Sequence, residues 1–419
     1  MGFRGGVWGC LLVVVLCGRV GSAQSGTPVP SKGSGTYPPE VQRALTLERE
    51  GKSAEAAGAW RAVVKAEPRN GQAYAHLGLL EARQEHYAEA IAAYRKALVL
   101  EPGIPQLRLN LGLALFKSGD FKDAAAIFEE ELRQHPKGPE TVRLTMLAGM
   151  SHYGAREFGA AASYLKEAAD ADPKNLELLM DLAHCYLWTK QLDATIEVYR
   201  RILLINPDSA EADMIAGEAL DAKGDNAGAV RQFQAAEKAN PKEPNVHFGL
   251  AYLLWVQKRF DEATPEFEAE LANDPKNSQA LLYLGDTYVR QTEYEKARGV
   301  LEQSGKYDPS PALVHLDLGI VYMETGANDA AVRELKKAAE IEPDNVAAHF
   351  RLAGLYRGMG KKDEAKAEFD KSKTLNKKTD QGVFRRIMEA NARHDADAAK
   401  DAGGRPTPPV DQPLDQPNR

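Results

Sequence analysis

Nine prolines recur at a nearly constant interval along this chain of 419 residues. Consecutive members of the series are 34 residues apart, except for one interval of 37 residues between Pro136 and Pro173. A fixed period of roughly 20 to 50 residues is typical of an array built from one repeated supersecondary unit. Each unit packs only on its neighbours, so such a chain grows without enlarging a single core. The prolines are Pro68, Pro102, Pro136, Pro173, Pro207, Pro241, Pro275, Pro309 and Pro343.

Each repeat carries small residues at two positions and a large residue at a third, when the repeats are aligned with the proline at position 32. Position 8 is glycine or alanine throughout, and position 20 is alanine in nine of ten repeats, with Thr195 as the exception. Small residues that face each other let two helices approach closely, and a large side chain fills the space beside them. Position 24 provides that side chain, as Trp60, Tyr94, Phe128, Leu165, Tyr199, Phe233, Phe267, Leu301, Leu335 and Phe369.

The spacing of the apolar positions predicts two helices in each repeat. Positions 4, 7, 8 and 11 share one face of a first helix, and positions 20, 24 and 27 share one face of a second. A glycine at position 15 predicts a left-handed cap where the first helix ends. The proline at position 32 ends the second helix because it has no N–H to donate. The glycines are Gly51, Gly119, Gly224, Gly326 and Gly360.

This pattern resembles the tetratricopeptide repeat, a helix–turn–helix unit of 34 residues. The resemblance covers residues 37–379 in about ten repeats and implies an all-α fold, an α-solenoid superhelix of tetratricopeptide helix–turn–helix repeats. The first repeat is degenerate, with Arg43 and Leu47 at positions 7 and 11, and the tenth ends without a proline at Lys377. Pro265 falls early in a second helix, where we expect a small distortion rather than a break.

The first 23 residues have the layout of a secretory signal peptide. Arg4 precedes a short apolar run from Val7 to Cys17, and small residues end the segment at Ala23. The run is shorter than the roughly 20 residues that cross a bilayer, so we expect no integral membrane span. We therefore expect an exported protein that is either periplasmic or secreted. The alternatives are a lipoprotein signal with Cys17 as the lipidated residue, which the bulky Leu16 disfavours, and an uncleaved anchor.

Three further segments differ in composition from the repeats. Residues 24–36 are rich in Gly, Ser and Pro and predict a flexible leader. Residues 380–395 have apolar residues at helical spacing, which predicts a capping helix over repeat ten, and residues 396–419 predict a disordered tail. The apolar residues of the predicted capping helix are Val383, Phe384, Ile387 and Met388.

Sequence motifs for catalysis and for metal binding are absent. The chain has no HExxH, no paired CxxC, no phosphate-binding P-loop and no nucleophile elbow. We therefore expect no catalytic residue, no cofactor and no metal site. The histidines are dispersed over different repeats, where ordinary polar positions on helices explain them; they include His76, His184, His247, His315 and His349.

The net charge and the number of cysteines exclude nucleic-acid binding and an internal disulfide from the expected properties. The net charge is −7 and no run of Lys and Arg interrupts it, so nucleic-acid binding is not expected. Cys185 is the one cysteine outside the predicted signal peptide, so the mature chain forms no internal disulfide. Because it lies beside core positions of a predicted helix, we expect a small buried thiol there.

The resemblance implies that positions 2, 5, 9, 12 and 13 of each first helix line a concave groove. In four repeats positions 5, 9 and 12 are apolar, and their i, i+4, i+7 spacing puts them on one helix face away from the core face. We call them, with His184 at position 9 of repeat five, the first-helix stripe. Its members are Leu109, Leu113, Phe116, Met146, Met150, Tyr153, His184, Phe248, Tyr252, Trp255, Leu316, Ile320 and Met323.

Two interpretations of the first-helix stripe stay open at this point. Exposed apolar patches of this kind mark interaction sites, but neighbouring first helices could also bury the stripe by packing. Acidic residues lie nearby, at Glu211, Glu218, Asp221 and Asp286, which favours a peptide with an apolar anchor and a basic flank. Position 9 offers no asparagine–lysine clamp for acidic C-terminal peptides, so that mode of the family is excluded.

The favoured function is therefore a non-catalytic, exported scaffold that binds a protein or peptide, in cell-envelope assembly or secretion. One alternative is a structural or self-associating array whose groove is covered by a second copy. Another is an accessory docking module for an envelope enzyme such as a glycosyltransferase.

Overall fold

The computed structural model describes residues 37–138 and 140–378. These residues form α-helices joined by short turns and contain no β-strand. They fall into two compact halves, an N-terminal half that ends at Pro207 and a C-terminal half that begins at Asp208. The predicted signal peptide, leader, capping helix and tail all lie outside the described residues.

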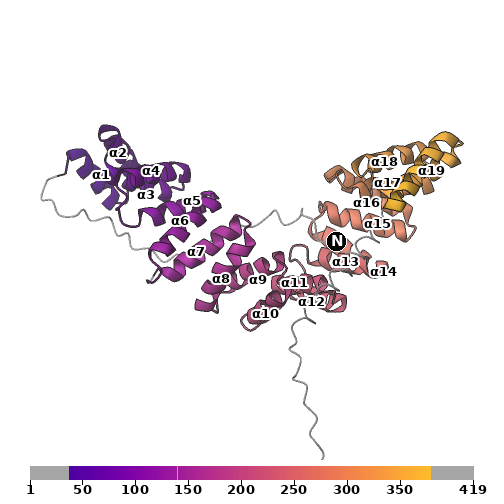
Figure 1. Ribbon diagram of the computed structural model, residues 1–419, viewed down its shortest axis with the longest axis horizontal. Helices are drawn as coiled ribbons and strands as arrows, with labels where there is room; N and C mark the ends of the chain where they lie inside the picture. The colour runs from indigo at the N-terminus through magenta and orange to yellow at the C-terminus, as the bar shows by residue number, and fades with distance from the viewer. Residues whose placement is uncertain (1–36, 139, 379–419) are drawn as a thin grey trace, which may run out of the picture. The chain divides into compact units, whose positions relative to one another are not determined.

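The helices follow the predicted pairs, with odd numbers for first helices and even numbers for second helices (Figure 1). The N-terminal half contains α1 (Pro39–Arg49), α2 (Ser53–Ala66), α3 (Gly71–Arg83), α4 (Tyr87–Leu100), α5 (Leu107–Ser118), α6 (Phe121–Gln134), α7 (Thr141–Gly154), α8 (Phe158–Ala171), α9 (Leu176–Trp188) and α10 (Leu192–Leu203). The C-terminal half contains α11 (Ala210–Ala222), α12 (Asn226–Ala239), α13 (Val246–Val256), α14 (Phe260–Asn273), α15 (Ser278–Arg290), α16 (Tyr294–Tyr307), α17 (Ala312–Glu324), α18 (Asn328–Ile341) and α19 (Val346–Gly358). A further helix runs over residues 362–378.

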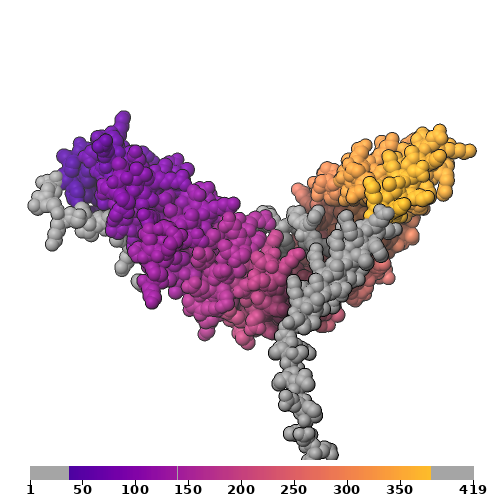
Figure 2. All heavy atoms as spheres, viewed as in Figure 1, coloured from indigo at the N-terminus to yellow at the C-terminus, as the bar shows by residue number. Residues whose placement is uncertain are grey.

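Within each half every helix from α1 to α19 packs against the next one along the chain, and most pairs of successive first helices also touch. Figure 2 shows the atoms of neighbouring repeats filling the space between the ribbons. This is the packing expected of an α-solenoid, in which each repeat completes the core of the one before it. The predicted all-α fold is confirmed.

The close approach of the two helices in a repeat depends on position 8. A Cβ added to Gly285 would lie 2.4 Å from Cγ of Leu301, and one added to Gly78 would lie 2.7 Å from the ring of Tyr94. Leu301 is fully buried and Tyr94 nearly so. The predicted arrangement is therefore correct, because the large side chain at position 24 occupies the space that the small residue leaves.

Position 15 adopts the left-handed conformation in every repeat. The five predicted glycines have φ between +72° and +87°. In the other five repeats a non-glycine residue takes the same conformation, with φ between +59° and +62°. Only the glycines could be predicted, because a charged or polar side chain gives no local signal of positive φ. The five other residues are Glu85, Arg156, Lys190, Lys258 and Thr292.

The first helices of five repeats begin with a side-chain cap two residues after the proline. The oxygen of the Asn or Ser side chain accepts a hydrogen bond from the backbone N–H three residues later, which satisfies one of the unpaired donors of the first turn. Repeats three and seven begin instead with Gln106 and Asn245 in left-handed conformation. The capping residues are Asn70, Asn175, Ser209, Asn277 and Asn345.

The structure also shows the surroundings of Pro265, Cys185 and Phe369. Pro265 lies inside α14, which runs unbroken from Phe260 to Asn273. Cys185 is fully buried, and this burial raises the pKa of its thiol to about 12, with the Asp181 carboxylate adding to the effect. Phe369 departs from the other position-24 residues, since it is 50% exposed beside Phe350 at the end of the described repeats.

Candidate peptide-binding surface of the first helices

In repeat three the first-helix stripe lies on α5. Leu109, Leu113 and Phe116 are half-buried and pack against the hydrophobic core of repeats two to four. The ring of Phe116 meets that of Phe121 edge to face at 5.5 Å between centroids. These side chains thus contribute to packing between repeats while part of each surface stays accessible.

In repeats four and five the stripe lies on α7 and α9. Met146, Met150, Tyr153 and His184 are all half-buried. The hydroxyl of Tyr153 lies 3.5 Å from Nδ1 of His184, so the two first helices meet through this pair. Burial lowers the pKa of His184 to about 4, which keeps its imidazole neutral at pH 7.

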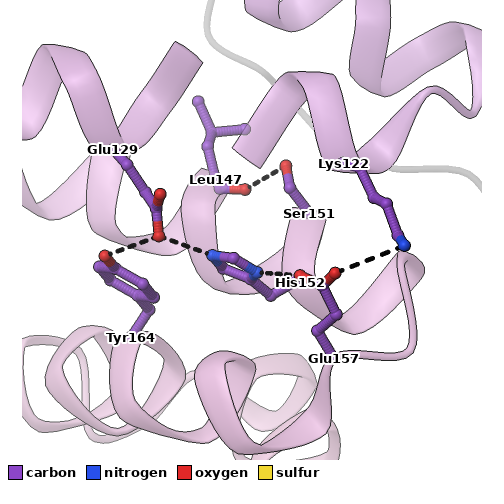
Figure 3. Close-up of polar contacts among 7 residues, drawn as sticks. All are labelled: Lys122, Glu129, Leu147, Ser151, His152, Glu157 and Tyr164. Carbon is purple, nitrogen blue, oxygen red and sulfur yellow. Dashed lines mark hydrogen bonds and ion pairs between the residues drawn. The ribbon is translucent and has the colours of Figure 1, made fainter. Parts of the chain in front are cut away.

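The helix α7 is held in place by a polar cluster next to Tyr153 (Figure 3). His152 is buried, its Nε2 lies 2.9 Å from Oε1 of Glu129 on α6, and its Nδ1 lies 2.8 Å from Oε2 of Glu157 before α8. Tyr164 on α8 donates to the same Oε1 of Glu129 at 3.1 Å, and Lys122 pairs with Glu157 at 3.8 Å. One imidazole therefore joins two helices and a turn, which fixes the orientation of the stripe residues on α7.

In repeat seven the stripe forms an aromatic cluster on α13. Phe248 is buried, and Tyr252 and Trp255 are half-buried beside it. Tyr283 from α15 meets Tyr252 at 5.1 Å and Trp255 at 4.9 Å, edge to face in both cases. Tyr283 was not predicted as part of the cluster, because it occupies position 6, which belongs neither to the predicted core face nor to the stripe.

An ion pair lies against this aromatic cluster. Trp255 Nε1 donates to Oδ2 of Asp286 at 2.5 Å, and Arg290 Nε donates to the same oxygen at 2.6 Å. The Arg290 guanidinium also lies over the Trp255 ring, 5.6 Å from its centroid, as in a cation–π contact. Asp286 is only 2% exposed, and its charge is paired with that of Arg290. It is therefore not available to bind a basic residue of a partner directly.

Acidic residues also lie on α11, which is the first helix of the repeat before the aromatic cluster. Burial, and to a lesser extent the charge of Asp221, raise the pKa of Glu218 to about 7. Burial also raises the pKa of Asp221, and that of Glu211, where Glu243 adds to the effect. Asp221 in turn adds to the raised pKa of Tyr252, whose main cause is burial. The Asp221 carboxyl group is therefore close to the aromatic cluster, and both it and Glu218 are half-buried.

In repeat nine the stripe lies on α17. Leu316 is buried, and Ile320 and Met323 are half-buried against a core cluster that includes Leu352 and Tyr356. On the same helix the Oδ2 atom of Asp317 is buried and has no hydrogen-bond partner among the described residues. Burial and the nearby Asp286 raise the pKa of Asp317 well above its usual range, while Arg290 opposes them.

Of the thirteen stripe residues, Phe248 and Leu316 are buried and the other eleven are half-buried. The stripe residues thus form four groups, which lie on α5, on α7 with α9, on α13 and on α17. A role of the stripe in binding stays a prediction.

Comparison with known proteins assigns the family. Sequence models described as tetratricopeptide repeat match residues 41–105, 81–139, 216–278, 248–311 and 282–345, and also 152–218 and 322–378. The chain belongs to the tetratricopeptide repeat family. Such arrays are generally non-catalytic scaffolds that commonly mediate interactions between proteins. No curated protein matches the chain.

Solved tetratricopeptide repeat proteins are similar to parts of this chain at low sequence identity. A crystal structure of MamA is 24% identical, covers 39% of this chain and 96% of its own, and has a TM-score of 0.37. YrrB, described as having an unusual peptide-binding site, is 19% identical over 45% of this chain and 97% of its own, at a TM-score of 0.40. A repeat protein from Parabacteroides merdae is 17% identical over 63% and 97%, at a TM-score of 0.45. No helix among the described residues is both long and apolar enough to cross a membrane.

Proposed function

We propose that this tetratricopeptide repeat protein is a non-catalytic scaffold that binds a protein or peptide segment along the first-helix stripe. The observation that carries the proposal is the cluster of Tyr252, Trp255 and Tyr283, which is only half-buried although it lies on the first helices of two repeats. Aromatic residues with part of their surface accessible are typical anchors of protein interfaces. A partner would insert an apolar side chain against them.

The partner segment is expected to carry a basic residue next to its apolar anchor. Glu218 and Asp221 on α11 are poorly solvated, and burial raises the pKa of each. A lysine or arginine from the partner would stabilise their ionised forms, since an opposite charge within a few ångströms lowers the pKa of a carboxyl group. Asp286 supports the site indirectly by holding Trp255.

Alanine substitutions at Tyr252 and Trp255 test the proposal. A photoreactive residue placed next to the cluster, at position 256 of α13, captures the partner in cells, and the captured protein is then quantified for each variant. We expect recovery to fall about tenfold or more for the double variant, as for interface hot spots. Circular dichroism checks that helicity is unchanged.

Tyr307→Ala is the matched control, because Tyr307 is an exposed aromatic residue on the second helix α16 and not on a first helix. Its recovery should equal that of the unmodified chain. Equal recovery for the Tyr252 and Trp255 variants would refute binding through the stripe.

The place of action is a separate proposal. The segment 1–23 has the layout of a signal peptide, which supports an exported scaffold in cell-envelope assembly or secretion. Fractionation of cells that express the full chain, with mass spectrometry of the mature N-terminus, tests it. An N-terminus at Met1 in the cytosolic fraction would contradict export.

A further inference from the structure

Three side chains with metal-binding atoms meet between repeats six and seven. Glu237 comes from α12, His247 from α13 and Glu266 from α14. One ligand atom from each lies within 4.8 Å of the others. His247 is 7% exposed, and its Nδ1 lies 2.8 Å from Oε2 of Glu266. The three residues share no spacing motif, because three different helices provide them.

The orientation of the His247 ring is fixed from its other side. Nε2 lies 3.0 Å from the carbonyl oxygen of Pro241 and donates a hydrogen bond to it. Nδ1 is therefore the nitrogen left free to bind a metal, and it faces the Glu266 carboxylate. Metal-binding histidines in proteins are almost always held this way, with the second ring nitrogen donating to a carbonyl or a carboxylate.

The repeats themselves show that the third residue is a separate feature. His315 and His349 make the same pair of contacts, with the carbonyls of Pro309 and Pro343 and with Glu334 and Glu368. This shared pair has a structural role, since it ties a first helix to the preceding turn and to the second helix. At the position of Glu237 those repeats have Gly305 and Ala339 instead.

Glu237 has no evident structural role of its own. Its side chain makes no hydrogen bond or ion pair with the described part of the chain, although the residue is half-buried. Burial raises its pKa, and the neighbouring Glu266 carboxylate raises it further, while His247 opposes them. Two carboxylates held side by side repel each other, and a divalent cation between them would remove that repulsion.

We propose that Glu237, His247 and Glu266 bind a divalent transition-metal ion, and that zinc fits the site best. One imidazole and two carboxylates are donors that zinc accepts, and three protein ligands leave a fourth tetrahedral position for water. The imidazole disfavours magnesium and calcium, which select oxygen ligands. At zinc–ligand distances of about 2.0–2.1 Å the edge of the tetrahedron is about 3.4 Å, so Nδ1 and Oε2 would separate by a few tenths of an ångström. A flexible glutamate side chain permits this.

Zinc titration of the full chain by calorimetry tests the proposal. We expect one zinc ion per chain at the highest-affinity step, and Glu237→Gln should weaken that step by about tenfold or more, as expected for a lost ligand. Because the change keeps the size of the side chain and breaks no hydrogen bond or ion pair of Glu237 within the described residues, this variant should keep the fold, which circular dichroism checks. Zinc should also raise the melting temperature of the unmodified chain and not that of Glu237→Gln.

The neighbouring repeats provide the controls. His315→Gln removes the same structural histidine from a repeat without the third carboxylate and should leave zinc affinity unchanged. Ala339→Glu places a third carboxylate beside His349 and Glu368 and should create a second zinc site. Absence of zinc binding by the unmodified chain, or equal affinity in Glu237→Gln, would overturn the proposal.

Discussion

The backbone at position 15 takes a left-handed conformation in all ten repeats, whether or not the residue is glycine. For a non-glycine residue this conformation stores strain, and the strain is largest for a β-branched residue such as Thr292, with φ +62°. The first helix must end there so that the chain can turn into the second, and packing of the two helices maintains the strained residue. Repeats with glycine achieve the same turn without strain.

Thr292→Gly should therefore stabilise the C-terminal half. Relief of strain of about 1–2 kcal/mol outweighs the greater unfolded-state entropy of glycine, about 0.5–1 kcal/mol, so the expected gain is about 0.5–1 kcal/mol. Gly326→Thr is the reverse change in the next repeat, where no atom lies within 4 Å of an added Cβ, and it should destabilise by a similar amount. Urea unfolding measures both; an unchanged midpoint for both variants would contradict the argument.

Ionisation of Glu218 should make stability depend on pH. Its pKa is raised from 4.5 to about 7 in the folded chain, so between these values the folded state holds a proton that the unfolded state has released. Stability from this group is complete below pH 4.5, falls as pH rises through that window, and is constant above about pH 7. The slope reaches at most about 1.4 kcal/mol per pH unit.

Glu218→Gln removes this titration. Relative to the unmodified chain, the variant should gain stability as the pH rises from 4.5 to 7 and then keep a constant difference. Denaturant unfolding at several pH values measures it. A difference that does not change with pH would mean that Glu218 does not titrate in this range.

At the scale of the helix, position 8 is where sequence analysis and structure agree most closely. Gly285 on α15 faces Leu301 on α16, and Gly319 faces Leu335 in the next repeat, with an added Cβ 2.4 Å and 2.6 Å from Cγ. The side-chain period predicted this facing pair because both residues belong to a core face. Tyr283 on the same helix and Asn277, which caps it, were not predicted, because the role of Tyr283 depends on neighbours from another repeat and that of Asn277 on the geometry of the turn.

Gly285→Ala should destabilise the C-terminal half by about 1–3 kcal/mol, because the new methyl group overlaps a fully buried leucine. Gly299→Ala is the matched control on α16, since no heavy atom lies within 4 Å of its added Cβ. That change should stabilise by about 1 kcal/mol through helix propensity. Thermal unfolding measures both variants. Shifts of the melting temperature in opposite directions would support close packing at position 8, whereas equal decreases would indicate a general effect of replacing glycine by alanine.

At the scale of the whole molecule, the period alone was sufficient to predict the array, because the same positions make the same packing contacts in every repeat. What lies on the array could be predicted only in part. The stripe residues share one helix face and were found by spacing, whereas Glu237, His247 and Glu266 belong to three helices and become neighbours only when the repeats stack. Residue spacing along a sequence carries no information about such a meeting.

Stacking of this kind also limits how far a defect spreads. Phe267 is fully buried in repeat seven, where it packs against Phe248 and Tyr283, so Phe267→Ala should cost about 3–5 kcal/mol locally. Because each repeat contacts only its neighbours, amide hydrogen exchange should accelerate in repeats six to eight and stay unchanged in repeats one to three. Exchange measured by mass spectrometry on peptides separates the outcomes. Uniform acceleration over both halves would mean that the chain unfolds as one cooperative body, and the description of the repeats as nearest-neighbour units would then be wrong.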